Sequence, residues 1–106
     1  IMSQFNNVTV NISANIYFDG GVISRSVHFA DGNHKTLGVA LPGEYQFTTE
    51  VEELMEFSSG EIDVLLPGEP AWRKITAGMS FVVPAASTFH LRVISISDYC
   101  CSYTRP

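Results

Sequence analysis

Two glycine-led stretches decide the fold of this chain: GEYQFTTEVEELMEFSSG, residues 43–60, and GMSFVVPAASTFHLRV, residues 78–93. In both, apolar and polar residues alternate, which is the pattern of β-strands buried on one face. Turn-forming dipeptides such as Asp-Gly, Pro-Gly and Ser-Gly separate these strands from similar runs on either side. Many short strands at near-regular spacing predict an all-β sandwich or barrel. The strand-like runs are 23–29, 36–41, 43–49, 53–57, 61–66, 72–76, 80–83, 89–94 and 99–103.

Parts of the two stretches match the spacing of the paired motifs of a cupin barrel, G-x5-H-x-H-x3-E-x6-G and G-x5-P-x-G-x2-H-x3-N. Glu53 falls at the glutamate of the first motif and Gly60 at its closing glycine. Gly78 and Pro84 keep the spacing of the second motif. We therefore expect residues 1–106 to form one domain with the cupin-type double-stranded β-helix, also called a jelly-roll barrel.

The metal-binding histidines of a cupin are replaced in this chain. Phe47 and Thr49 stand at the two histidine positions of the first motif, and Phe89 stands at that of the second. The histidines that are present, at positions 28, 34 and 90, lack the H-x-H spacing of metal cupins. The sequence therefore predicts a barrel without a metal site.

The composition excludes several classes of partner. The formal net charge is −5, and only six Lys and Arg residues are scattered along the chain. A polyanion needs a basic binding face, so nucleic acid is not expected as a partner. No window has the apolar length that spans a bilayer, and residues 1–18 lack the pattern of a signal peptide, so we expect no membrane partner and a cytoplasmic location. Cys100 and Cys101 are adjacent, which points their side chains to opposite faces of a strand, and we expect reduced thiols.

Strand alternation assigns faces to the candidate site residues. If Phe47 points inward, its neighbours at 45 and 49 point inward too, and those at 44, 46 and 48 face the other way. Such a face combines aromatic rings with one carboxylate, a mixture typical of a small-molecule pocket. The alternative is that these apolar side chains only pack the core. The expected inward set is Tyr45, Phe47, Thr49, Glu53, Phe81 and Phe89.

Several segments carry a resemblance to a known family: NIYFDG, LGVALPGEYQFTTE, EELMEFSSGEIDVLLPGEPAW, AGMSFVVPAASTFHLRV and the terminal YCCSY. Together, over about residues 15–103, they resemble the small cupin-type pyrimidine/purine nucleoside phosphorylases. The resemblance implies phosphorolysis of purine and pyrimidine nucleosides to a free base and a pentose 1-phosphate. It also implies a homodimer that uses orthophosphate as co-substrate and needs no metal or organic cofactor.

The implied reaction suggests a role for each candidate. Positive charge builds on the sugar as the glycosidic bond breaks, so Glu53 is the candidate catalytic carboxylate. The implied substrates share only a flat ring, which Tyr45, Phe47 and Phe89 can stack on, with Phe81 and Thr49 beside them. Cys101 is more simply explained as a structural thiol than as a nucleophile.

The phosphate site is the weakest part of the resemblance. Members of the family carry lysines where this chain has Gly21 and Ile23, and an arginine where it has Ser102. The candidates for holding phosphate are Arg92, Thr49 and the backbone amides near residues 58–60, with Arg25 as a substitute for the missing basic residues. The alternatives left open are a non-catalytic, metal-free cupin that binds a sugar or nucleoside and, less favoured, a metal-dependent cupin enzyme. Residues 1–14 precede the first strand-like run and are expected to be either flexible or exchanged with a neighbouring subunit.

Overall fold

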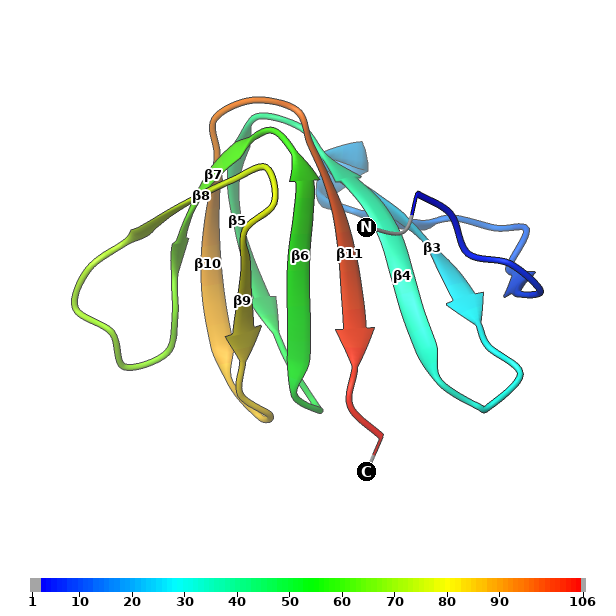
Figure 1. The fold of residues 1–106 in the computed structure, drawn as a ribbon. Helices are drawn as coiled ribbons and strands as arrows, with labels where there is room; N and C mark the ends of the chain where they lie inside the picture. Colours follow the sequence, from blue (N-terminus) through cyan, green and yellow to red (C-terminus); the bar gives the residue numbers. More distant parts are fainter. Residues whose placement is uncertain (1–2, 106) are drawn as a thin grey trace.

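Strands make up most of the chain and pack as two antiparallel sheets that face each other (Figure 1). The computed structural model describes residues 3–105, so Ile1, Met2 and Pro106, the ends of the expected domain, lie outside the described residues. A short 3-10 turn, η1 (Phe18–Gly20), connects two strands near the N-terminus. The strands are β1 (Thr9–Val10), β2 (Asn15–Tyr17), β3 (Val22–His28), β4 (His34–Ala40), β5 (Gly43–Thr48), β6 (Glu53–Ser59), β7 (Glu61–Leu65), β8 (Arg73–Thr76), β9 (Ser80–Val83), β10 (Thr88–Val93) and β11 (Ser97–Tyr103).

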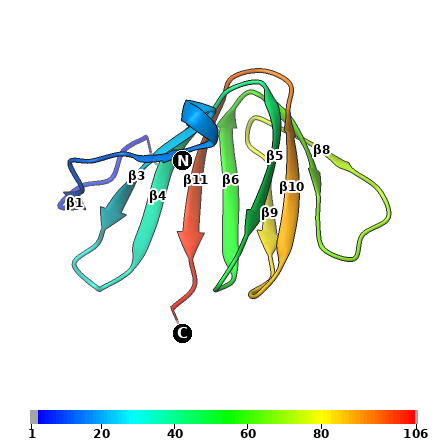
Figure 2. The ribbon, with the colours of Figure 1, turned by 180° about the vertical axis from the view of Figure 1, so that it is seen from behind.

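The order of strands within the sheets is that of a jelly roll, because central neighbours such as β4 and β11 or β5 and β10 are distant in sequence. The larger sheet runs β1-β3-β4-β11-β6-β9, with β2 also paired to β3, and the smaller runs β5-β10-β7-β8. Seen from behind, β5 and β10 cover β6 and β9 at one side of the molecule (Figure 2). In each of the two motif stretches, the two strands belong to different sheets: β5 and β10 to the smaller sheet, β6 and β9 to the larger. Their apolar faces therefore meet between the sheets.

The packed core lies between the sheets around β7, β8 and β9. Ile62, Val64 and Val83 are completely buried there, and Ile75 from β8 joins them. The alternation expected from the sequence places these side chains inward and their charged neighbours outward. On the side of β3, β4 and β11 the space between the sheets is not filled by large aliphatic side chains, and a cavity remains.

All nine strands expected from the sequence are present, with ends shifted by no more than a few residues. The strands β1 and β2 were not expected, whereas η1 falls at the expected Asp-Gly turn. Within residues 3–14, β1 pairs with β3 of the same chain, and the Phe5 ring lies 5.1 Å from that of Phe29. Within residues 3–105 no helix has the length and apolar character that a membrane crossing requires.

Candidate functional site

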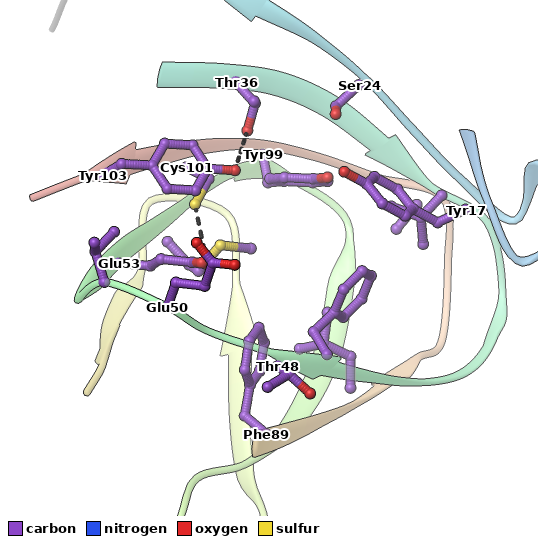
Figure 3. Close-up of a pocket in the computed structure, with 16 residues that line it drawn as sticks. Tyr17, Ser24, Thr36, Thr48, Glu50, Glu53, Phe89, Tyr99, Cys101 and Tyr103 are labelled. Carbon is purple, nitrogen blue, oxygen red and sulfur yellow. Dashed lines mark hydrogen bonds between the residues drawn. The ribbon is translucent and has the colours of Figure 1, made fainter. Parts of the chain in front are cut away.

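The candidate site is the cavity between the two sheets, which has a volume of about 340 Å³ (Figure 3). Its walls come from seven strands and from the loop between β5 and β6. The volume lies at the lower end of the range for pockets that hold small molecules. The lining residues are Tyr17, Val22, Ser24, Thr36, Ala40, Phe47, Thr48, Glu50, Val51, Glu53, Met55, Phe89, Leu91, Tyr99, Cys101 and Tyr103.

Glu53 is the half-buried carboxylate of this cavity. It opens β6, and the pairing of β6 with β11 sets it opposite Tyr103. The Cys101 thiol donates a hydrogen bond to Glu53 Oε1 at 3.4 Å. Burial raises the pKa of the Glu53 carboxyl above its ordinary value, and the hydrogen bond from Cys101 acts in the opposite direction. A carboxylate held in this way is a stronger base than an exposed glutamate.

A second hydrogen bond lies beside the first. The hydroxyls of Tyr103 and Thr36 are 3.2 Å apart, on adjacent walls of the cavity (Figure 3). Burial raises the pKa of Tyr103 and that of the Cys101 thiol far above their ordinary values. Both groups are therefore protonated at neutral pH, and near Glu53 they act as neutral hydrogen-bonding groups.

Aromatic rings form the opposite wall. Phe47 on β5 and Phe89 on β10 are register partners, with ring centroids 5.8 Å apart and planes inclined by 25°. Tyr17 meets Phe47 edge-on at 5.8 Å. Tyr99 lies against Gly38, where a Cβ would collide with the tyrosine ring, so glycine at 38 is what lets this ring lie across β4. These rings give the cavity flat apolar surfaces.

Of the six residues expected to face inward, Glu53, Phe47 and Phe89 line the cavity and Tyr45, Thr49 and Phe81 do not. The Tyr45 hydroxyl donates to the Leu41 carbonyl at 2.7 Å, and its ring lies 5.0 Å from that of Phe18. Tyr45 therefore closes the far end of the barrel, where it also blocks the space next to Gly21.

Thr49 and Phe81 have structural positions. Thr49 is buried, and its hydroxyl donates to the Pro84 carbonyl at 2.7 Å and accepts from the Ser87 N–H at 3.0 Å. The alternation of β5 continues through Thr49, which is buried as expected, but Thr49 does not line the cavity, whereas the exposed Thr48 does. Phe81 lies behind Phe89, at 6.3 Å between centroids, within the core.

The two arginines proposed for phosphate lie outside the barrel and do not line the cavity. The Arg92 guanidinium lies 4.2 Å from the Trp72 ring centroid and 3.5 Å from Glu44 on the outer face of the smaller sheet. Arg25 lies on the outer face of the larger sheet, where its Nε donates to the Ile12 carbonyl at 3.5 Å. Both alternate with inward-facing neighbours, so the strand pattern itself turns them outward.

Several lining residues were not expected from the sequence. They come from β2, β3, β4, β11 and the loop before β6, which only the long-range strand pairing brings to one place. The alternation of Tyr99, Cys101 and Tyr103 was a usable signal, because it repeats the pattern of an inward face. The other unexpected polar residues are Tyr17, Ser24, Thr36, Thr48 and Glu50.

The cysteines and histidines take the places that the spacing indicates. Cys101 lines the cavity and Cys100 faces the groove on the other side of the sheet, and both thiols are free. His28 and His34 stack with ring centroids 5.0 Å apart, and His34 in turn stacks on Tyr103. Among residues 3–105, no three His, Cys, Asp or Glu side chains are grouped as a metal site would require.

Comparisons with known proteins agree on the family and on the fold. Residues 12–103 match the family model described as pyrimidine/purine nucleoside phosphorylase. A protein of that name from Chlorobium chlorochromatii is 61% identical over 102 residues, which cover 96% of this chain and 98% of the relative.

Solved structures give the same result. The crystal structure of a protein of unknown function from Acinetobacter sp. ADP1 is 42% identical, with a TM-score of 0.92 over 95% of this chain and 98% of that one. A cupin-2 domain protein from Shewanella frigidimarina is 13% identical, with a TM-score of 0.64 over 77% of this chain and 79% of that one, and shares the fold alone. The expected cupin-type barrel and the family resemblance are both confirmed.

Proposed function

The chain belongs to the pyrimidine/purine nucleoside phosphorylase family, and we propose that it cleaves the N-glycosidic bond of purine and pyrimidine nucleosides and transfers the pentosyl group to orthophosphate. The products are a free base and a pentose 1-phosphate. The observation that carries the proposal is the half-buried Glu53 carboxylate, which shares a cavity with the Phe47 and Phe89 rings. The names of its relatives supply the class of reaction.

Glu53 acts on the sugar in this proposal. As the bond between the base and the anomeric carbon lengthens, positive charge develops on the pentose ring. A carboxylate in a partly desolvated wall stabilises that charge more strongly than one in water does. The thiol of Cys101 fixes the position of Glu53 Oε1 and leaves the second carboxylate oxygen to face the ligand.

The base lies against the aromatic wall. Rings of Phe47, Phe89 and Tyr17 offer faces and edges that every nucleobase can contact, and none of them reads the pattern of donors and acceptors on a base edge. This supports acceptance of purines and pyrimidines alike. The hydroxyls of Ser24 and Thr36, on the wall toward β3 and β4, are placed to hold the sugar.

A second candidate function is binding of a sugar or nucleoside without turnover. The observation in its favour is that the residues lining the cavity include no Lys or Arg to hold phosphate. Both functions use the same pocket, so they differ in turnover and not in affinity.

The deciding experiment incubates the purified protein with uridine and adenosine, with and without phosphate, and follows free base by chromatography. Base release that phosphate increases supports phosphorolysis, whereas binding by calorimetry without any base release supports the second candidate. Glu53→Gln should remove base release, and Glu52→Gln, an exposed neighbour outside the cavity, is the matched control that should not.

We also propose that the protein is a homodimer that pairs through the outer face of the larger sheet. A groove crosses this face, and Ile23, Leu37 and Val39 are each more than a third exposed in it. Contiguous exposed apolar side chains of this kind mark interaction surfaces.

The charges around the groove favour a second copy as the occupant. Arg25 and Lys35 stand on β3 and β4, whereas Glu56 and Asp98 stand on β6 and β11. A two-fold axis parallel to the strands lays the basic half of one copy over the acidic half of the other. Light scattering should give the dimer mass, and Leu37→Glu should give the monomer mass; a monomeric parent chain would refute the pairing.

A further inference from the structure

The cavity is unusual for a site that must hold an anionic co-substrate, because no lysine or arginine reaches it. The sequence has six such residues, and all of them fall in the described part of the chain. Each is placed elsewhere. Three form ion pairs: Arg73 with Glu69, Lys74 with Glu61 and Arg92 with Glu44. Two donate to backbone carbonyls: Arg25 to that of Ile12 and Arg105 to that of Asp31. The sixth, Lys35, lies over the rings of Phe5 and Phe29.

The histidines do not replace the missing cations. His34 is the nearest to the cavity wall, since its ring stacks on that of Tyr103 at 4.8 Å. Burial, together with the neighbouring His28, lowers the pKa of His34, so this imidazole is neutral at pH 7. His90 stands on β10 between the inward-facing Phe89 and Leu91 and so points out of the barrel.

The charges that do line the cavity are negative. Glu50, from the loop between β5 and β6, and Glu53 lie at the same end of the cavity, next to Cys101 (Figure 3). Glu50 is exposed and Glu53 is half-buried. Two carboxylates without a compensating cation repel a phosphate dianion and leave a neutral nucleophile unaffected.

We infer that this cavity also transfers the pentosyl group to water, so that the protein hydrolyses nucleosides in competition with phosphorolysis. The inference rests on the proposed function, because it uses the same bound nucleoside and the same carboxylate. The water oxygen forms a bond to the anomeric carbon as the bond from that carbon to the base nitrogen breaks. The electron pair of the broken bond goes to the base, which takes a proton from solvent.

Glu53 receives the proton that the attacking water loses. Its hydrogen bond from Cys101 occupies Oε1, and the remaining oxygen is available to a water molecule in the cavity. The raised pKa of Glu53 makes it a better proton acceptor than an ordinary carboxylate, which is what a general base for water needs. Hydrolysis therefore needs only groups that the cavity already contains.

The test measures base release from uridine and adenosine by protein dialysed free of phosphate, and again at about 10 mM phosphate, which is above most KM values. We expect the phosphate-free rate to lie within about tenfold of the rate with phosphate, with free pentose as the sugar product. A phosphate-free rate lower than that overturns the inference and leaves phosphorolysis standing. No base release in either medium overturns the proposed function itself.

A charge reversal tests the electrostatic reason. Glu50→Lys places a cation at the cavity without touching Glu53, and should raise the ratio of pentose 1-phosphate to free pentose by about tenfold or more. Glu52→Lys changes the net charge equally on the same loop but outside the cavity, and is the matched control. An equal ratio in the two variants would show that the cavity charge does not select the acceptor.

Discussion

Replacing Thr49 by valine tests whether this residue is structural, as its contacts indicate, or binds substrate, as its position in the cupin motif suggests. The Thr49 hydroxyl donates to the Pro84 carbonyl at 2.7 Å and accepts from the Ser87 N–H at 3.0 Å. It thereby fastens the turn between β9 and β10, in which Ala86 has a left-handed φ of 51°. Valine keeps the shape of threonine and removes both interactions.

The expected loss can be worked out from these two bonds. A hydrogen bond contributes about 1 kcal/mol net, and a donor left unpaired and partly buried, here the Ser87 N–H, costs about 1–3 kcal/mol. Thr49→Val should therefore lower the free energy of unfolding by about 2–4 kcal/mol. For a chain of this length that corresponds to a melting temperature lower by roughly 8–16 °C.

Thermal unfolding followed by circular dichroism measures the loss of stability. Steady-state kinetics on the folded protein measure the KM for nucleosides. The KM for nucleosides should change by less than about twofold, because Thr49 does not line the cavity. Thr49→Ser keeps the hydroxyl and should recover most of the stability. An unchanged melting temperature combined with a KM raised tenfold or more would refute the structural assignment.

Three further predictions concern the cavity. Glu53→Gln should lower kcat by about 10²–10⁴-fold. Because burial raises the pKa of Glu53, its ionised form destabilises the folded state, so the variant should have the higher melting temperature at pH 7, and this difference should disappear as the pH falls through that pKa. Thermal scans from pH 4 to pH 8 would show a constant difference if the carboxyl were unperturbed. Cys101→Ala removes a hydrogen bond that lowers the Glu53 pKa, so the acidic limb of the pH profile of kcat/KM should move to higher pH. Cys101→Ser should leave this limb in place. An unmoved limb in the alanine variant would contradict the hydrogen bond between Cys101 and Glu53. Phe47→Ala should raise KM for uridine and adenosine together, by about 5–30-fold for a lost stacking contact of about 1–2 kcal/mol. An effect on one base alone would argue against a common stacking wall.

The extent to which sequence predicts this molecule depends on how far apart the interacting residues lie. Alternation is a local property, so it located the strands from β3 to β11 within a few residues. The two-residue strand β1 and the short β2 have too few residues to show a period, and they exist because β3 offers them an edge. The left-handed φ of Asp19 in η1 accompanies an Asp-Gly turn signal, whereas that of Phe18 has no local sequence signature.

The site follows the same rule. Phe47, Phe89 and Glu53 were found because each sits on a motif strand and its face follows from alternation. Thr49 has the buried face that alternation predicts, yet it does not line the cavity, because its hydroxyl bonds the Pro84 carbonyl and the Ser87 N–H. The wall from β4 and β11 was missed because only the pairing of strands more than fifty residues apart, such as Cys101 with Thr36, places it opposite the motif strands.

The position of β11 has a consequence for how this protein is made. It lies between β4 and β6, yet it follows every other described strand in sequence. During synthesis β4 and β6 emerge from the ribosome without the strand that joins them, each with an open edge that other chains can pair with. Completion of the larger sheet, and of the wall that carries Cys101, must wait until β11 itself has emerged. Nascent chains that lack β11 are therefore expected to bind chaperones at these open edges.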